Sequence, residues 1–175
     1  MDWWSLIWFN QAIPKKAFLL WLAVRNRLTT VDRLPTWGYK GDTQCCFCRH
    51  GTESRDHLFF NCSFSSQIWE ICMKRRNFSN PLLDWQNVVE ECSRKCISKK
   101  LKSVLCRLVL SSSVYNIWRA RNEIKHNGRP KTEEQILRSI FPEVRTRISG
   151  KGNFKKNEEN VNICLSWNID LSIPV

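Results

Sequence analysis

Three cysteines and one histidine, spaced so that they can meet at one point, constrain the fold of this 175-residue chain more than any other feature. Cys45, Cys48, His57 and Cys62 form a C-x2-C-x8-H-x4-C pattern. A two-residue gap between cysteines lets a tight turn aim both thiolates at one ion, and an imidazole with a third thiolate completes a tetrahedron. The pattern therefore predicts a closed, structural zinc site.

The spacing also constrains the backbone at the second half of the site. His57 and Cys62 are five residues apart, which is a rotation of about 140° on a regular helix, so they cannot share one helical face. The helix must break before Cys62. Cys46 and His50 remain as competing ligands. Cys46 is adjacent to the predicted ligand Cys45, and His50 is only two residues after the predicted ligand Cys48, so both spacings are cramped.

The other cysteines lie in or near apolar runs and are interpreted as buried thiols: Cys72, Cys92, Cys96, Cys106 and Cys164. Cys92 and Cys96 are four residues apart and form a possible half-site, but no further pair of ligands lies near them in sequence. The start Met1-Asp2-Trp3-Trp4 does not resemble a secretory signal, so we expect an intracellular protein. In a reducing compartment, nine cysteines favour a metal site and free thiols over disulfides.

Apolar residues recur at helical spacing, and no alternating strand pattern of any length is present, so the predicted class is all-α. The most apolar run, 17–24, is too short to span a bilayer. We expect helical segments at 14–24, after Thr29, at 53–60, from about 63, at 84–96, at 99–126 and from Thr132 to 148. Their grouping predicts a zinc-binding domain at 1–77, a helical extension at 78–149 and a flexible tail at 150–175.

The net charge of +12 favours contact with polyanions, because neutralising phosphates releases their counterions. The first 62 residues carry only +3, and the remainder carries +9. From Cys92 to Asn122 there is no acidic residue. The nucleic-acid-binding residues expected there are Arg94, Lys95, Lys99, Lys100, Lys102 and Arg107.

A series of short segments occurs in a characteristic order along residues 3–75: Ile7-Trp8-Phe9, Ile13-Pro14-Lys15, Phe18-Leu19-Leu20-Trp21, Arg27-Leu28-Thr29-Thr30, Asp32-Arg33-Leu34, Trp37-Gly38, the Cys45 and Cys48 pair, Glu53, His57-Leu58-Phe59-Phe60, Cys62 and Trp69. In these segments and in their order, residues 3–75 resemble the zinc-binding domain of plant non-LTR retrotransposon reverse transcriptases. The later run Ile117-Trp118-Arg119-Ala120-Arg121-Asn122 is similar to the helical region that joins this domain to a ribonuclease H domain in such polyproteins.

The resemblance implies a zinc module and its connector. The six aspartates are never adjacent, so the Tyr-x-Asp-Asp turn of the family's polymerase is absent from this sequence, and no segment matches a ribonuclease H domain. We therefore expect a stand-alone, non-catalytic module that binds zinc and, weakly and without sequence preference, RNA or DNA. The alternative is a protein-interaction or relic scaffold domain that uses the apolar helices after residue 84.

Overall fold

The computed structural model describes residues 3–75, 84–150 and 154–169, and these residues form helices and no strands. The only regular extended pairing among them is an isolated antiparallel bridge between Gln44 and Thr52. The elements are α1 (Trp4–Ile7), α2 (Pro14–Val24), the 3-10 helix η1 (Val31–Trp37), the π-helix η2 (His57–Asn61), α3 (Ser63–Lys74), α4 (Trp85–Lys95), α5 (Leu101–Asn127), α6 (Glu133–Ser149) and α7 (Glu158–Trp167). The predicted all-α class is confirmed.

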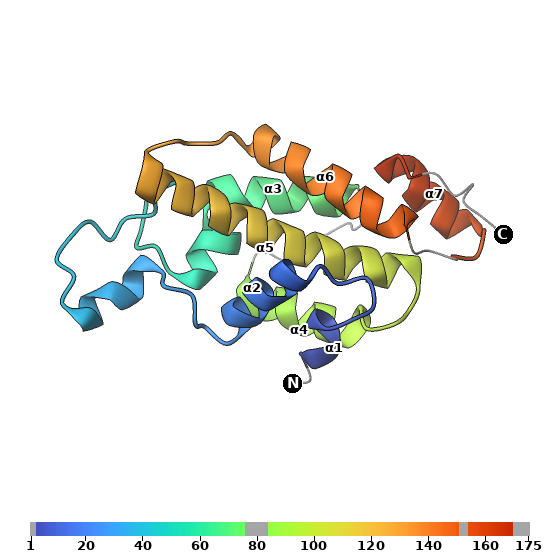
Figure 1. The fold of residues 1–175 in the computed structure, drawn as a ribbon, viewed down its shortest axis with the longest axis horizontal. Helices are drawn as coiled ribbons and strands as arrows, with labels where there is room; N and C mark the ends of the chain where they lie inside the picture. Colours follow the sequence, from blue (N-terminus) through green and yellow to red (C-terminus); the bar gives the residue numbers. More distant parts are fainter. Residues whose placement is uncertain (1–2, 76–83, 151–153, 170–175) are drawn as a thin grey trace.

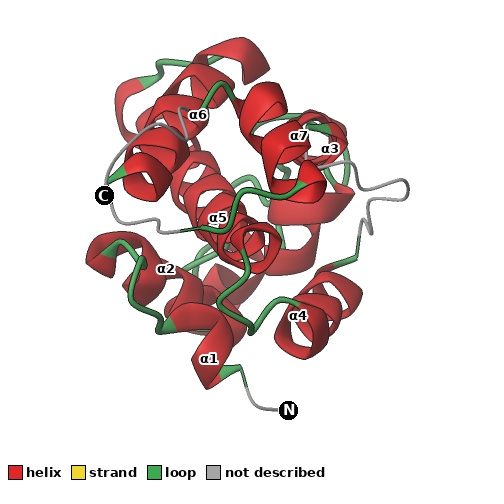
Figure 2. Cartoon of the chain, turned by 90° about the vertical axis from the view of Figure 1, so that its right-hand side faces the viewer, coloured by secondary structure: helices red, strands yellow, loops and turns green. Residues whose placement is uncertain are grey.

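Helix α5 runs through the centre of the molecule, and the other helices pack around it (Figures 1 and 2). Its sequence is apolar or small over most of its circumference, which is typical of a helix buried on all sides. Helices α2 and α6 make the most extensive contacts with α5, and α3 packs against α6 and α5. The segment that contains η1 extends from the end of the molecule where α5 terminates (Figure 1).

The predicted helix ends are confirmed at several positions. Asp84 accepts a hydrogen bond from the Asn87 amide at 3.0 Å and so caps α4. Thr132 and Gln135 form a reciprocal capping box at the start of α6. Gly128 ends α5 with a φ of +62°, in the left-handed region that glycine enters without steric cost.

One hydrophobic core extends from α1 to α7 in the described parts of the chain. Trp85 of α4 lies at a junction in this core, with ring centroids 5.5 Å from Phe59 and 5.6 Å from Phe60. The expected boundary near residue 77 lies outside the described residues. Segments on both sides of that boundary share the same core.

Three helices are also joined by a buried lysine. Lys16 of α2 is fully buried, and its ammonium donates to Ser112 Oγ of α5 at 2.9 Å and pairs with Glu143 of α6. Desolvation by burial lowers the pKa of Lys16, while the hydrogen bond to Glu143 opposes that shift. This contact fixes α2 across the α5–α6 pair.

Helix α7 corrects the expectation of a flexible tail for residues 158–167. Asn157 caps this helix by accepting from the Asn160 amide at 2.8 Å. Trp167 is buried edge-on against Phe141 at 5.3 Å, and its indole donates to the Arg75 carbonyl at 3.1 Å. The first residues of the segment are polar, so the sequence did not indicate that its later residues form an apolar face. Residues 151–153 and 170–175 of the expected tail lie outside the described residues.

In the described parts of the chain, no helix combines the length and the apolar character needed to cross a membrane.

Candidate metal centre

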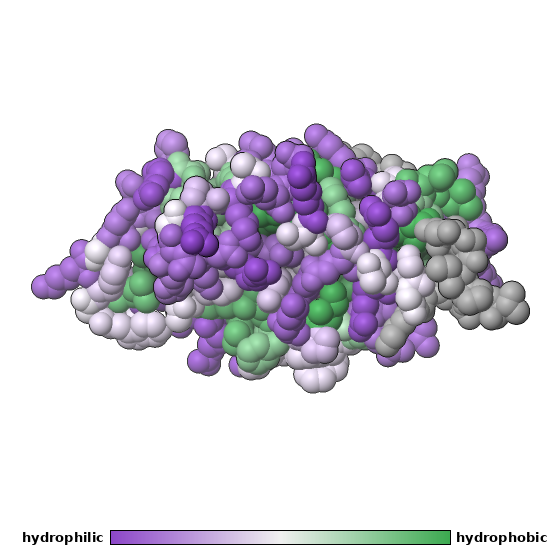
Figure 3. Space-filling view, turned by 45° about the horizontal axis from the view of Figure 1, so that its top comes forward, coloured by the Kyte–Doolittle hydropathy of each residue, from purple (hydrophilic) through white to green (hydrophobic). Residues whose placement is uncertain are grey.

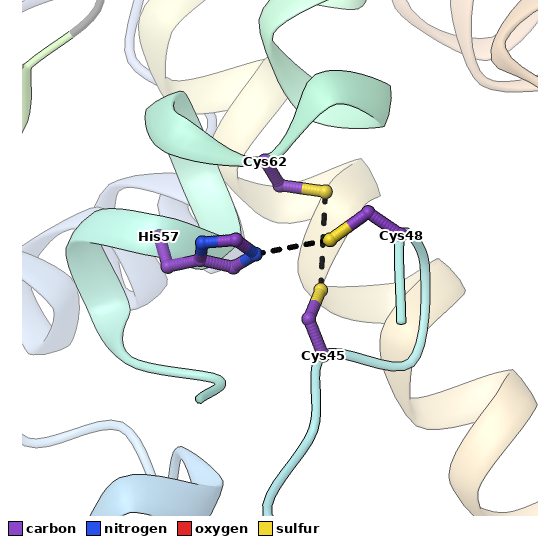
Figure 4. Close-up of side chains that lie close together, drawn as sticks. All are labelled: Cys45, Cys48, His57 and Cys62. Carbon is purple, nitrogen blue, oxygen red and sulfur yellow. Dashed lines mark hydrogen bonds between the residues drawn. The ribbon is translucent and has the colours of Figure 1, made fainter. Parts of the chain in front are cut away.

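Cys45, Cys48, His57 and Cys62 converge on one point, and one ligand atom of each lies within 4.8 Å of those of the other three (Figure 4). The sulfurs of Cys45 and Cys62 are 3.8 Å apart. The Cys48 sulfur lies 3.2 Å from His57 Nε2. The two cysteines at the ends of the pattern are fully buried, and the other two ligands are half-buried.

The first two cysteines lie on a tight loop that is held by backbone hydrogen bonds. The Cys45 amide donates to the Gly51 carbonyl at 3.1 Å, and the Arg49 amide donates back to the Cys45 carbonyl at 3.0 Å. Arg49 and Gly51 both have positive φ, at +59° and +67°, which turns the chain sharply after Cys48. The His50 amide also donates to the Cys48 sulfur at 3.4 Å.

The second pair of ligands is brought together by a widened helical turn. The Ser54 hydroxyl accepts from the His57 amide at 3.1 Å and starts the turn. The Cys62 amide then donates to the His57 carbonyl at 2.7 Å, across five residues rather than four, which is the π-helical pattern. Cys62 itself is extended, with φ −76° and ψ 131°, and precedes α3. The predicted helix break before Cys62 is confirmed, in the form of a π turn.

The protonation of the two buried cysteines is coupled. Cys45 donates its proton toward Cys62, and this hydrogen bond, together with burial, raises the pKa of the Cys45 thiol. The same hydrogen bond, helped by the backbone amides of Ser65 and Phe64, lowers the pKa of Cys62. The amides at the start of α3 thus favour a thiolate at this position.

The donor set fits a zinc ion. Three sulfurs and one imidazole nitrogen match a structural Cys3His site, and metal–sulfur bonds of about 2.3 Å would separate two sulfurs by about 3.8 Å in a tetrahedron. The competing ligands do not join the cluster. Cys46 is buried apart from it, and burial raises its pKa to about 12, while His50 is exposed.

A buried ion pair, which the sequence pattern did not reveal, holds the loop between η1 and η2 against α5. We call this loop the metal-binding loop. Glu53 is fully buried and accepts from Arg121 Nε at 3.0 Å and Nη2 at 2.7 Å. The same carboxylate accepts from the Val31 amide at 3.2 Å, at the start of η1. The only sequence signals were the place of Glu53 in the family order and an arginine in the apolar part of α5. Arg121 lies in the acid-free stretch from Cys92 to Asn122, but its side chain is buried in this pair.

The structure separates the predicted nucleic-acid-binding residues into two groups. Lys99 and Lys100 are exposed between α4 and α5, whereas Arg94 and Lys95 are exposed but paired with Glu91. Lys102 is paired with Glu159 at 3.1 Å.

Arg107 corrects the prediction, because it is buried. Its guanidinium donates to the carbonyls of Ser5, Ser98 and Ser103 at 3.1, 2.8 and 3.3 Å, and it lies over the Phe9 ring. Because its donors are bonded to carbonyls inside the protein, Arg107 stabilises the fold and is not available to contact phosphates.

The fold adds a basic residue from the expected tail to these lysines. Lys99 and Lys100 share a surface pocket of about 420 Å³ with Phe154 and Lys155. The pair Lys155-Lys156 was the available sequence signal, but its approach to α5 depends on the placement of α7. We call Lys99, Lys100, Lys102 and Lys155 the basic surface.

The chain is a helical protein whose Cys3His cluster is a candidate metal site. Residues 1–69 match the family described as zinc-binding in reverse transcriptase. The match spans all four ligand positions of the cluster and ends within α3. No curated protein and no solved structure matches the chain.

Proposed function

We propose that this protein is a zinc-stabilised nucleic-acid-binding module derived from a retrotransposon reverse transcriptase, without catalytic activity of its own. The observation that carries the proposal is the combination of a Cys3His cluster in a reverse-transcriptase zinc-binding family with a separate lysine-rich surface. The cluster supports a structural role, and the lysines support contact with phosphates.

Zinc would be held by Cys45, Cys48, His57 and Cys62, all of which are protein ligands. When bound, the ion would cross-link the loop to the start of α3. Because all four ligands come from the protein, no coordination position would be open to a reactant. The four side chains would bind the ion in a closed site. Three thiolates and one Zn²⁺ carry a formal charge of −1, so the centre itself does not attract phosphates.

The basic surface is the better candidate for phosphate contact. Lys99 and Lys100 are exposed, and Lys155 joins them across the pocket from a segment more than 50 residues away in the sequence. Phe154 in the same pocket adds an aromatic ring on which a base can stack. Lysine ammonium groups neutralise phosphates without reading base sequence, so binding should be weak and non-specific.

The two features lie toward opposite ends of α5. The basic surface is at the start of the helix, whereas Glu53 is bonded to Arg121, 20 residues later. At 1.5 Å per residue this is about 30 Å along the axis. Zinc therefore acts on the fold of one end, and nucleic acid contacts the other.

The metal assignment is tested by paired alanine variants of neighbouring cysteines. Cys48→Ala should lose bound zinc, because it removes a ligand, while Cys46→Ala should keep one zinc per chain, because Cys46 lies outside the cluster. Elemental analysis of the purified chains measures both. Equal loss of zinc from the two variants, or no zinc in the unmodified chain, would show that the ligand set is wrong.

The nucleic-acid assignment is tested by replacing Lys99, Lys100 and Lys102 by alanine together. Fluorescence anisotropy with single-stranded RNA, across a salt series, should show weaker binding and a salt slope smaller by up to about two units, at about 0.7 per neutralised phosphate. The matched control replaces three exposed arginines, Arg25, Arg27 and Arg129, and removes the same charge elsewhere. If both variants change the slope equally, the basic surface has no dedicated role.

The alternative, a protein-interaction or relic scaffold domain, is favoured by a different observation. The apolar residues of α5 and α6 pack into the core, but Trp4 and Phe18 near the N-terminus are 60% and 53% exposed. Figure 3 shows a face on which hydrophilic side chains predominate and hydrophobic ones form separate small groups. Unchanged RNA binding in the lysine variant would support this alternative.

A further inference from the structure

A second group of three cysteines meets in the core, far from the Cys3His cluster in sequence. Cys92 and Cys96 lie at the end of α4, and Cys106 lies on α5. Their sulfurs all lie within 4.8 Å of one another, and those of Cys92 and Cys106 are 3.4 Å apart. The described residues include all nine cysteines, and none of them forms a disulfide. The sequence suggested only half of this group, because Cys106 is brought to it by the packing of α4 on α5.

We propose that Cys92, Cys96 and Cys106 form a second metal site, a three-thiolate site for a soft, thiophilic cation of the monovalent copper class. This inference is independent of the zinc centre and of nucleic-acid binding.

The composition of the group selects this chemistry. Sulfur-only ligand sets favour soft ions, whereas carboxylates and carbonyls favour magnesium or calcium. Structural zinc takes four protein ligands, and among the described residues no histidine, carboxylate or fourth cysteine joins these three. Metal–sulfur bonds of about 2.3 Å put the sulfurs of a trigonal site about 4 Å apart, within the range spanned by this group.

The surroundings provide partial charge compensation, and the group lies beside an exposed connection. The Arg107 guanidinium is fixed by its bonds to three carbonyls, and its charge interacts with Cys96 and Cys106. Cys96 is the C-cap residue of α4, and the following residues 97–100 are exposed. Opening of the C-terminal end of α4 would bring the group into contact with solvent and with an entering ion.

Binding needs no oxidant or reductant. Hydrogen bonds to Cys106 and Cys96, together with burial, raise the pKa of the Cys92 thiol. One Cu⁺ forms three copper–sulfur bonds, and the three thiols release three protons to solvent. The ion would bind α4 to α5 in the same way that zinc binds the loop to α3.

The test uses the full chain with its Cys3His centre loaded with zinc, under anaerobic conditions, with Cu(I) supplied from a coloured chelator. We expect one tightly bound copper per chain with the zinc retained. Loss of an outer-shell partner of a ligand already costs 10- to 100-fold in affinity, so Cys96→Ala and Cys106→Ala should each lower copper affinity by about 100-fold or more. Cys72→Ala, which removes an equally buried thiol of α3, should leave it unchanged.

Three results would overturn the proposal: no copper uptake, equal affinity in all three variants, or release of one zinc for each copper bound. X-ray absorption at the copper edge gives a measurement that does not depend on the variants. It should show three sulfur neighbours, and a first shell dominated by nitrogen or oxygen would also overturn the proposal. If Cys106→Ala does not fold, Cys96→Ala at the helix end still provides the comparison.

Discussion

The carboxylate of Glu53 joins three parts of the structure that are separate in sequence: the metal-binding loop, the start of η1 and the C-terminal part of α5. Its partner Arg121 also donates to the Thr29 carbonyl at 3.3 Å and lies over the Trp118 ring. Buried charges are tolerated when they are paired, and Arg121 pairs with Glu53 through Oε1 of the carboxylate. The pair therefore positions the loop relative to the helix rather than acting on a ligand.

Replacing Glu53 by glutamine should destabilise the fold by about 3 kcal/mol, because it leaves the buried Arg121 without a counter-charge. Asp56→Asn is the matched control, since Asp56 pairs with Arg55 in the same segment but is 43% exposed, and it should cost less than about 1 kcal/mol. Urea unfolding of the zinc-loaded chains measures both. Similar midpoints for the two variants would show that the buried pair does not hold the loop.

At the scale of elements, the metal-binding loop has little regular structure of its own. Between η1 and η2 it is held by the Gln44–Thr52 bridge, a few backbone hydrogen bonds and the stacking of Phe47 on Phe64 at 4.5 Å. Helices α5 and α6, in contrast, bury long apolar faces against each other. The loop should depend on the metal, and the two helices should not.

Removal of zinc by a chelator should therefore expose the amides of residues 43–62 to hydrogen exchange while α5 and α6 stay protected. Binding free energy is folding free energy for a segment that the metal cross-links. Hydrogen-exchange mass spectrometry with and without zinc measures the difference. Unchanged protection of 43–62 at a metal content shown to fall would contradict a structural role for the ion.

At the scale of the whole molecule, the family-like segment and the helices that follow it share one core. Leu20 of α2, Trp69 of α3 and Leu105 of α5 belong to the same buried cluster. The Lys16 contact with Ser112 and Glu143 crosses the same division. The N-terminal segment thus completes its core with residues supplied by α5 and α6.

A fragment ending at residue 77 should consequently fail to form a rigid structure even with zinc bound. Without α5 and α6, the apolar faces of α2 and α3 would be exposed to water, at roughly 25 cal/mol for each Å² left uncovered. Near-UV circular dichroism should be weak, and a hydrophobic dye should bind the fragment but not the full chain. A well-dispersed NMR spectrum of the zinc-loaded fragment would show instead that the segment is a domain by itself.

Much of the secondary structure could be read from local sequence, because local features decide it. Proline at the first turn of α2, aspartate before α4, the capping box of α6 and the glycine after α5 each act within a few residues. The four residues of the Cys3His cluster could likewise be selected, since two tight spacings restrict which side chains can meet. Helix α7 was missed because its first turns are polar and its stability comes from Trp167 in the core.

The sequence by itself determined the helical class, most helix ends and which four residues converge at the first cluster. Only the tertiary structure decided which basic residues face water, that Glu53 and Arg121 form a buried pair, and that Cys106 joins Cys92 and Cys96. The reason is physical: capping and ligand spacing depend on neighbours a few residues apart. Burial and charge pairing depend on which helix faces meet, and that is set by the packing of the whole core.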